Sequence, residues 1–196
     1  NTVQSAQHTA QTLRERFPGE DIRLLHSRFL APHRALKEQE LVRALGKEGE
    51  RPRRLIVVGT QVLEQSLDID FDLLISDLCP MDLLLQRMGR LHRHRRQRPG
   101  QVSEPRCYVL GLGDPGTQEG PDSGSIAVYG EYLLARTKSL LPPVLNLPND
   151  IPRLVNDTYN DSLPPGVDIP DYETMKNTWE KEMNKRVEKA GTFLLK

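Results

Sequence analysis

Two arginines near the middle of the chain, Arg90 and Arg93, have the residue type and the spacing to act on a phosphoryl group. Three positions apart on a helix, they would project from the same side of it. A guanidinium offers a planar fork of N–H donors, which suits the charge that develops on phosphate oxygens during phosphoryl transfer. Gly89 beside them lets a phosphate or another backbone approach closely. The alternative is a solvated basic helix, because further arginines follow at once in the sequence.

The residues just before these arginines have the marks of a helix start and an apolar face. Pro80 and Asp82 suit the first turn of a helix, where proline loses no hydrogen bond and a carboxylate faces the positive end of the dipole. We therefore expect one helix with the arginines on its outer side. Its inner side would be anchored in a core by Leu83, Leu84, Leu85, Met88 and Leu91.

Two apolar runs precede this helix and are typical of strands in a parallel sheet. Residues 54–59 form a buried strand that leads into a polar loop at Thr60 and Gln61, and residues 73–77 form a second strand. Parallel α/β sheets place their ligands beyond the carboxyl ends of the strands. The order of strand, polar loop, strand and arginine helix therefore predicts a ligand site at that edge.

Further helices and strands alternate along the chain, which predicts βαβ units and the α/β class. The last helix carries an apolar stripe on a charged surface, a pattern typical of docking on a neighbour. The expected elements are helices at residues 2–17, 32–45, 125–141 and 171–195, strands at 22–25 and 106–112, and an extended proline-rich connector at 142–170.

The composition fits a soluble globular protein. Of 196 residues, 37% are hydrophobic and 28% are charged, and the formal net charge is +0. No apolar run approaches the ~20 residues of a membrane span, so a membrane protein is excluded. Two cysteines without a secretory signal indicate a reduced, cytoplasmic protein, and the spacing of the five histidines predicts no metal site.

Charge is segregated along the chain although it sums to zero. Basic residues gather at 51–54 and 87–98, and acidic residues gather at 64–82. Such segregation indicates a working surface. Because the chain starts at Asn1 without an initiator methionine, we expect it to be an excised or processed piece of a longer protein.

The run GTQVLEQSLDIDFDLLISDLCPMDLLLQRMGRLHRH, residues 59–94, resembles motifs V and VI of superfamily 2 helicases. In its residue sequence, this run is similar to the signature helicase–nuclease of type I CRISPR systems. The resemblance implies a RecA-like three-layer α/β fold with a mostly parallel sheet, followed by an extended linker and a helix. Residues 1–141 would be the second RecA-like helicase domain, carrying motifs IV–VI, and residues 142–196 the proline-rich connector and linker helix.

The resemblance assigns roles at the nucleotide. It implies that Arg93, the arginine finger, and Arg90 contact the γ-phosphate of ATP bound between two RecA-like domains. Gln86 would orient the nucleotide or a neighbouring arginine. Asp68 would hydrogen-bond the ribose or an arginine of motif VI, the alternative being a helix cap or turn.

The resemblance also assigns contacts with single-stranded DNA. Thr60 and Gln61 lie at a strand end, where hydroxyl and N–H groups hold phosphates without reading bases. The family's other motifs in this domain match Thr2, Ser27 and Arg28, each of which can donate to phosphate.

Several roles stay open at this point. Asp70 and Asp72 fit either a metal site or the ordering of their loop, and the motif context favours loop ordering. Glu64 fits a nucleic-acid contact or a salt bridge, and Arg34 fits a family role or an internal salt bridge. The basic segment 95–98 fits DNA binding or a solvated face.

Other helicase parts are absent from the sequence. It contains no GxxxxGK[ST] loop for phosphates, no Asp-Glu-x-His box for Mg²⁺ and no HD nuclease cluster. By resemblance, ATP would bind between this domain and a first RecA-like domain of the intact parent, Mg²⁺ would be held by that first domain, and this chain alone would be inactive.

The resemblance therefore implies a fragment of an ATP-dependent 3′-to-5′ single-stranded DNA translocase or helicase of type I CRISPR interference. Its partners would be single-stranded DNA, the first RecA-like domain and the Cascade surveillance complex, with no membrane. The alternatives are an inert binding module that docks on Cascade or an anti-CRISPR protein, and a domain of another superfamily 2 helicase.

Overall fold

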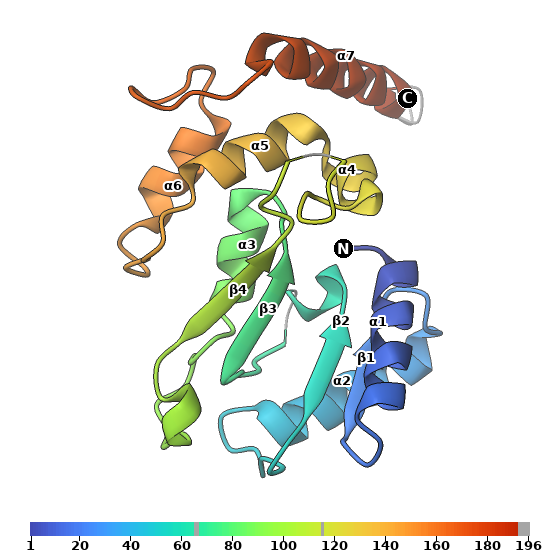
Figure 1. The fold of residues 1–196 in the computed structure, drawn as a ribbon. Coiled ribbons are helices and arrows are strands. Elements are labelled where there is room, and N and C mark those ends of the chain that lie inside the picture. The colour runs from blue at the N-terminus through green and yellow to red at the C-terminus, as the bar shows by residue number, and fades with distance from the viewer. Residues whose placement is uncertain (65–66, 115, 192–196) are drawn as a thin grey trace. The chain divides into compact units, whose positions relative to one another are not determined.

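The structure is a computed structural model that describes residues 1–64, 67–114 and 116–191 (Figure 1). The chain divides into two compact units. The first unit contains Asn1–Asp77 and Asp82–Gly111, and the second contains Leu78–Met81 and Leu112–Lys196. The predicted domain boundary after residue 141 stays a prediction.

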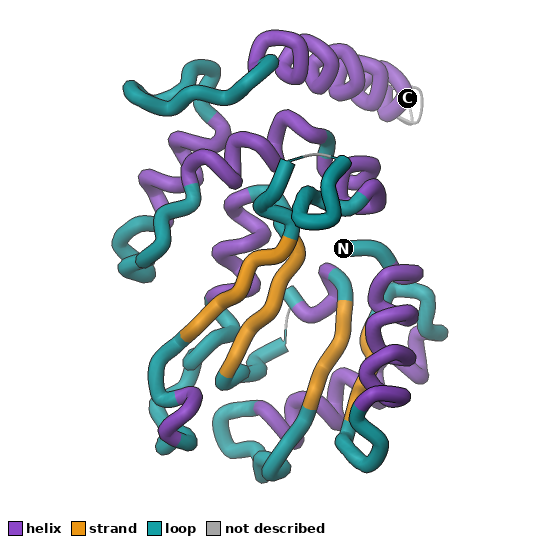
Figure 2. Tube along the Cα trace, in the orientation of Figure 1, coloured by secondary structure: helices purple, strands orange, loops and turns teal. Residues whose placement is uncertain are grey.

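The first unit is built from parallel strands connected by helices (Figure 2). Strand β1 pairs with β2, with Leu25 opposite Gly59, and β3 pairs with β4, with Asp77 opposite Leu110. Parallel pairing brings the carboxyl ends of paired strands to the same edge, so the loops that follow them meet there. The elements of this unit are α1 (Val3–Arg16), β1 (Ile22–Leu25), α2 (Ala31–Leu45), β2 (Ile56–Gly59), the short 3-10 helix Gln61–Leu63, β3 (Leu73–Asp77), α3 (Met81–Met88), the 3-10 helix Gly100–Val102 and β4 (Arg106–Leu110).

The core of the first unit forms where α2 meets β1 and the segment before β3. Helix α2 presents Leu41, Ala44 and Leu45 at helical spacing, and all three are buried. They pack with Leu25 of β1 and with Leu67 and Ile69. This core fixes residues 67–69 next to the sheet, and the acidic segment that begins at Asp68 is held in place as a result.

Much of the predicted secondary structure is confirmed. The strands at residues 22–25 and 73–77 have the expected bounds, and α1 and α2 lie within a residue or so of the expected ranges. Helix α1 begins after Thr2, whose side chain accepts a hydrogen bond from the backbone N–H of Ser5 at 3.1 Å. Helix α2 ends at Gly46, as expected.

The predicted arginine helix is wrong in its length. Helix α3 stops at Met88, and the backbone then tightens, because the N–H groups of Arg90 and Leu91 donate to carbonyls only three residues back. Leu91 next forms a bridge with Phe71. Arg90 and Arg93 therefore do not share a helix, and their geometry depends on contacts outside α3.

The second unit is helical. Its helices are α4 (Ser123–Tyr129), α5 (Glu131–Leu140), α6 (Ile151–Tyr159) and α7 (Tyr172–Gly191). The single helix predicted at 125–141 is wrong, because Gly130 takes a φ of 80° and separates α4 from α5. The extended connector predicted at 142–170 is also wrong in part, because it contains α6, with a proline in its first turn.

A buried arginine holds the helices of the second unit together. Arg136 on α5 is 0% exposed and donates to the hydroxyls of Tyr132 and Tyr172 at 2.9 and 2.6 Å. It also donates to the carbonyls of Asp157 and Ser162 at 2.6 and 3.0 Å. These contacts join α5 to the end of α6 and the start of α7, and no sequence pattern around Arg136 predicts them.

The apolar stripe expected on the last helix packs against a neighbouring helix at Trp179 and is exposed at Val187. Trp179 packs against Tyr132 with ring centroids 5.3 Å apart, whereas Val187 is 65% exposed. The part of the predicted helix beyond residue 191 lies outside the described residues. Within the described ranges, no helix is both long enough and apolar enough to span a membrane.

A matched pair of leucines on α2 tests the core. Leu41 is 1% exposed and Leu36 is 57% exposed on the same helix. We expect Leu41→Ala to lower the free energy of unfolding by ~2–5 kcal/mol, because it removes buried carbons and leaves a cavity. Leu36→Ala should change it by less than ~0.5 kcal/mol. Denaturant unfolding of both variants measures the difference, and equal effects would contradict the assignment of this core.

Candidate nucleotide and nucleic-acid site

Arg93 lies in irregular backbone after α3 and is both held and accessible. Its Nε atom donates to Oδ1 of Asp68 at 2.6 Å, and its side chain is 42% exposed. The hydrogen bond from Arg93 is the main reason that the pKa of Asp68 is lowered. An ion pair this exposed is weak, so an anion of higher charge can take the place of Asp68.

Arg90 is more buried than Arg93. Its Nη2 atom donates to the carbonyl of Glu64 at 2.9 Å. Its Nε atom is buried and lacks a hydrogen-bond partner among the described residues. Burial lowers the pKa of Arg90, and the nearby charge of Arg93 lowers it further. Two cations held close together, one with an N–H group that no described residue accepts, suit an anionic ligand.

Arg87, which the sequence analysis did not single out, is the most connected arginine of α3. It donates to Oε1 of Glu64 at 2.5 Å and to Oγ of Ser76 at 2.8 Å. It also donates to the carbonyl of Asp77 and to Oδ1 of Asn1, at 3.3 and 2.9 Å. These contacts fix α3 against the ends of β2 and β3.

Glu64 forms an ion pair with Arg87, one of the two interactions left open for it. Glu64 is 6% exposed. Burial raises the pKa of Glu64, and the charge of Arg87 opposes that rise.

Gln86, next to Arg87 in the sequence, is exposed on α3. Arg34 also forms an internal ion pair, with Glu38 one turn along α2 at 3.4 Å.

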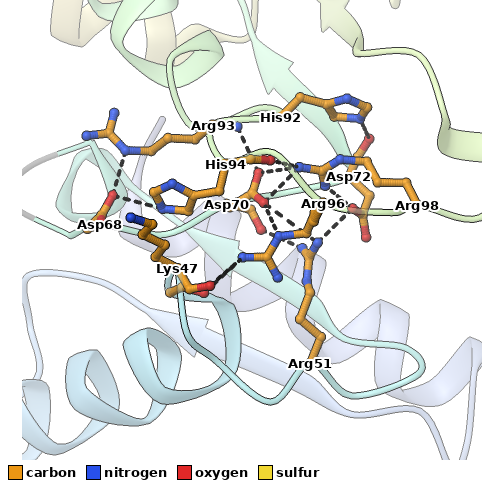
Figure 3. Close-up of polar contacts among 11 residues, drawn as sticks. Lys47, Arg51, Asp68, Asp70, Asp72, His92, Arg93, His94, Arg96 and Arg98 are labelled. Atoms are coloured by element: carbon orange, nitrogen blue, oxygen red, sulfur yellow. Dashed lines mark hydrogen bonds and ion pairs between the residues drawn. The ribbon is translucent and has the colours of Figure 1, made fainter.

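Asp70 and Asp72 bind arginines (Figure 3). Asp70 is 0% exposed and lies 2.8 Å from Nε of Arg96 and 2.7 Å from Nη2 of Arg98. Asp72 pairs with Arg98 and with Arg51, the latter at 2.8 Å. Among the residues that the structure describes, no cluster of acidic, histidine or cysteine side chains could hold a metal ion. The expectation of loop ordering at these two carboxylates agrees with this arrangement.

The basic segment 95–98 turns two of its arginines inward. Only 5% of the Arg98 side chain and 16% of the Arg96 side chain are exposed, because both turn inward to Asp70. Arg96 also donates to the carbonyls of Gly46 and Lys47 at 3.0 and 3.3 Å. Arg95 is exposed. Arg96 and Arg98 are therefore held inside the unit, while Arg95 remains at the surface.

The residues expected to contact DNA gather at the carboxyl ends of β1 and β2. Ser27 and Arg28 follow β1 and are exposed, while Thr60 follows β2 and is 6% exposed. Gln61 donates to the carbonyl of Asn1 at 3.3 Å, so the start of the chain lies at this edge as well. The Thr2 hydroxyl caps α1 beside them. The structure therefore brings all five positions to one edge of the first unit.

The chain is similar to CRISPR-associated proteins in sequence and structure. Residues 1–96 match a family model described as CRISPR-associated nuclease/helicase Cas3, C-terminal. A relative from Streptococcus thermophilus, CRISPR-associated nuclease/helicase Cas3, is 50% identical over 163 residues, which is 83% of this chain and 17% of the relative.

Solved structures agree with this match. The structure of T. fusca Cas3-ATP aligns with a TM-score of 0.80 and 36% identity, over 95% of this chain and 22% of that one. A chain from a CRISPR RNA-guided surveillance complex, pre-nicking, aligns with a TM-score of 0.75 and 37% identity, over 96% of this chain and 24% of that one. The predicted RecA-like α/β class is confirmed, and the chain spans only a minor part of the proteins that it resembles.

Neighbouring residues on α3 test the role of Arg87 in holding the site together. We expect Arg87→Met to lower the free energy of unfolding by ~3–5 kcal/mol, because it leaves the buried Glu64 carboxylate without its cation. Gln86→Met, next to it on an exposed position, should change the value by less than ~0.5 kcal/mol. Denaturant unfolding measures both, and a stable Arg87→Met variant would show that the ion pair contributes little.

Proposed function

The chain belongs to the Cas3 family of CRISPR-associated nuclease/helicases, and from this premise we propose that it supplies the arginine side of an ATP site. The site would serve an ATP-dependent helicase that moves along single-stranded DNA in the 3′-to-5′ direction during type I CRISPR interference. The supporting observation is the pair of Arg90 and Arg93, one with a buried N–H donor that no described residue uses and the other exposed.

The two arginines are held in different ways. Arg93 needs only to leave the exposed Asp68 carboxylate for a phosphate oxygen, which is a change of partner at the surface. Arg90 is anchored at the Glu64 carbonyl and keeps its Nε group available. Both would neutralise charge that grows on the γ-phosphate in the transition state. Gln86, exposed one turn before Arg90, would orient the nucleotide.

ATP fits these residues, and the solved structure of T. fusca Cas3-ATP supports the choice of nucleotide. Asp68 would contact the ribose or keep Arg93 aligned. Mg²⁺ would be bound by another domain of the intact helicase, since the described part of this chain offers no ligand cluster for it. When bound, the metal neutralises phosphate charge, and the contribution of this chain is the two guanidiniums.

The DNA track would run along the edge where β1 and β2 end. Ser27 and Arg28 are exposed there and can donate to phosphates without reading bases. Thr60, Gln61 and Thr2 would complete this contact through their hydroxyl, amide and backbone groups. The solved surveillance complex supports Cascade as a partner of the intact helicase.

A docking module is the second candidate, and one observation favours it. Apolar side chains are exposed on β3 and β4: Leu73, Ile75, Tyr108 and Leu110. Such a surface suits contact with Cascade or an anti-CRISPR protein. Capture by Cascade, without ATP turnover when the first RecA-like domain is added, would favour docking over the helicase role.

The finger assignment predicts a specific kinetic defect. In the intact helicase, Arg93→Ala should lower ATP turnover by ~10³–10⁵-fold while ATP and DNA still bind, because its charge matters most in the transition state. Arg93→Lys should rescue little, since lysine lacks the planar fork. Steady-state turnover, nucleotide affinity and melting temperature are measured for both variants.

Leu84→Ala is the control for folding in that experiment. Leu84 is 0% exposed, so its truncation should cost ~2–5 kcal/mol of stability. Arg93→Ala should melt like the unmodified protein. Normal ATP turnover in Arg93→Ala would show that Arg93 is not the arginine finger. Unfolding of that variant would show that Arg93 has a structural role.

The chain alone should have negligible ATPase activity and should bind DNA weakly. Its sequence has no phosphate-cradling loop, and the residues proposed to contact DNA would donate to phosphates and not to bases. Affinity for a labelled single strand should fall steeply between ~50 and ~200 mM salt, because phosphate contacts release counterions. Steady turnover, or tight binding that is selective for sequence and insensitive to salt, would contradict the proposal.

A further inference from the structure

The position of Arg93 is not set by a helix. Helix α3 ends at Met88, and residues 89–98 follow in irregular backbone. His92 just before Arg93 has a φ of 50°, a conformation that is uncommon outside glycine. A long, flexible side chain on irregular backbone needs some other group to place it for catalysis.

Asp70 contacts the backbone of Arg93 directly (Figure 3). Its Oδ1 atom accepts the N–H of Arg93 at 2.8 Å. Asp70 is 0% exposed and comes from the loop before β3, so the contact joins two segments 23 positions apart in the chain. Two backbone hydrogen bonds join the same segments: the N–H of Phe71 donates to the carbonyl of Arg90 at 2.8 Å, and the N–H of His92 donates to the carbonyl of Phe71 at 3.0 Å.

The carboxylate of Asp70 also forms ion pairs with arginines that follow Arg93 in the sequence. Arg96 and Arg98 lie further along the irregular segment and pair with Asp70 at 2.8 and 2.7 Å. Arg51, from the loop before β2, is 3.9 Å from it and pairs more closely with Asp72. Three residues of the segment 93–98 therefore contact the buried carboxylate of Asp70, and Arg93 is the first of them along the chain.

We infer that Asp70 is a positioning residue for Arg93: it holds the backbone from which the finger reaches the nucleotide. Asp70 is buried, and both of its carboxylate oxygens already accept hydrogen bonds, from the Arg93 N–H and from Arg98, so it is not presented to a ligand. It differs in this from Asp68, which is 54% exposed and touches the guanidinium of Arg93. The inference rests on the proposed function, because it assumes that Arg93 acts on ATP.

Kinetics of the intact helicase test the inference. Asp70→Asn keeps an oxygen for the Arg93 N–H but removes the charge that gathers Arg96 and Arg98. We expect kcat for ATP to fall by ~10²-fold, the effect of a small misplacement of a catalytic group, with KM changed by less than ~3-fold. Asp72→Asn is the matched control: it belongs to the same ion-pair network but does not touch Arg93, so kcat should stay within ~3-fold.

A double-mutant cycle separates positioning from general damage. In an Arg93→Ala background, Asp70→Asn should have no further effect on kcat, because the group that it positions is gone. If Asp70→Asn does not fold, Arg98→Gln replaces it in the cycle and should lower kcat by ~10-fold only when Arg93 is present. An additive loss in either cycle would overturn the inference.

The outcomes distinguish this inference from the proposed function. Full turnover in Arg93→Ala would overturn the finger itself and with it any need to position it. A normal kcat in folded Asp70→Asn, with turnover abolished in Arg93→Ala, would overturn only the positioning role. Equal losses in Asp70→Asn and Asp72→Asn would also overturn it, because the effect would then belong to the whole ion-pair network.

Discussion

The arrangement of the site depends on one buried negative charge. Asp70 lies out of contact with water and is surrounded by the guanidiniums of Arg96 and Arg98 and the N–H of Arg93. Burying a carboxylate without partners would cost several kcal/mol, so the chain must return these arginines to it whenever it folds. This requirement closes the segment after α3 onto the loop before β3. It gives irregular backbone a defined course without a helix.

Burial separates the aspartates that bind arginine into two kinds. Asp70 exchanges its partners with difficulty, because every alternative leaves a charge unpaired in a low dielectric. Asp68 is exposed, and its bond with Arg93 is screened by water, so Arg93 can leave it at little cost. A fixed backbone and an exchangeable side chain are what a residue needs if it is to meet a ligand that arrives and departs. Arg87 adds the third support, since its bonds to Glu64, Ser76 and Asp77 hold α3 against the strand ends.

Sequence patterns predicted the elements with strong periodicity or apolar runs, and missed features that depend on distant partners. The strands at residues 22–25 and 73–77 were predictable, because apolar runs between polar loops have few other structures available. Gly89 and Gly130 were harder to interpret. Both end helices, yet glycine also occurs within helices or where a ligand approaches, so its position alone does not decide. Helix α6 does not follow from its proline alone, because proline suits extended chain as well as the first turn of a helix.

The polar contacts show the same limit. Arg90, Arg93 and Asp68 were found from their spacing and motif, and the structure brings Arg93 and Asp68 into contact. The inward turn of Arg96 and Arg98 could not be predicted, because a run of arginines is equally consistent with a solvated surface until its carboxylate is located in space. Arg136 is a similar case, since its partners are hydroxyls and carbonyls from other helices.

Affinity for a transition-state analogue tests the phosphoryl-transfer role of Arg93 most directly. In the intact helicase, ADP with aluminium fluoride mimics the transferring phosphoryl group, whereas ADP alone does not. We expect Arg93→Ala to weaken binding of ADP with aluminium fluoride by at least ~10²-fold and to leave binding of ADP nearly unchanged. Equal affinity of the variant and the unmodified protein for the analogue would contradict the account, because Arg93 would then make no contact that grows in the transition state.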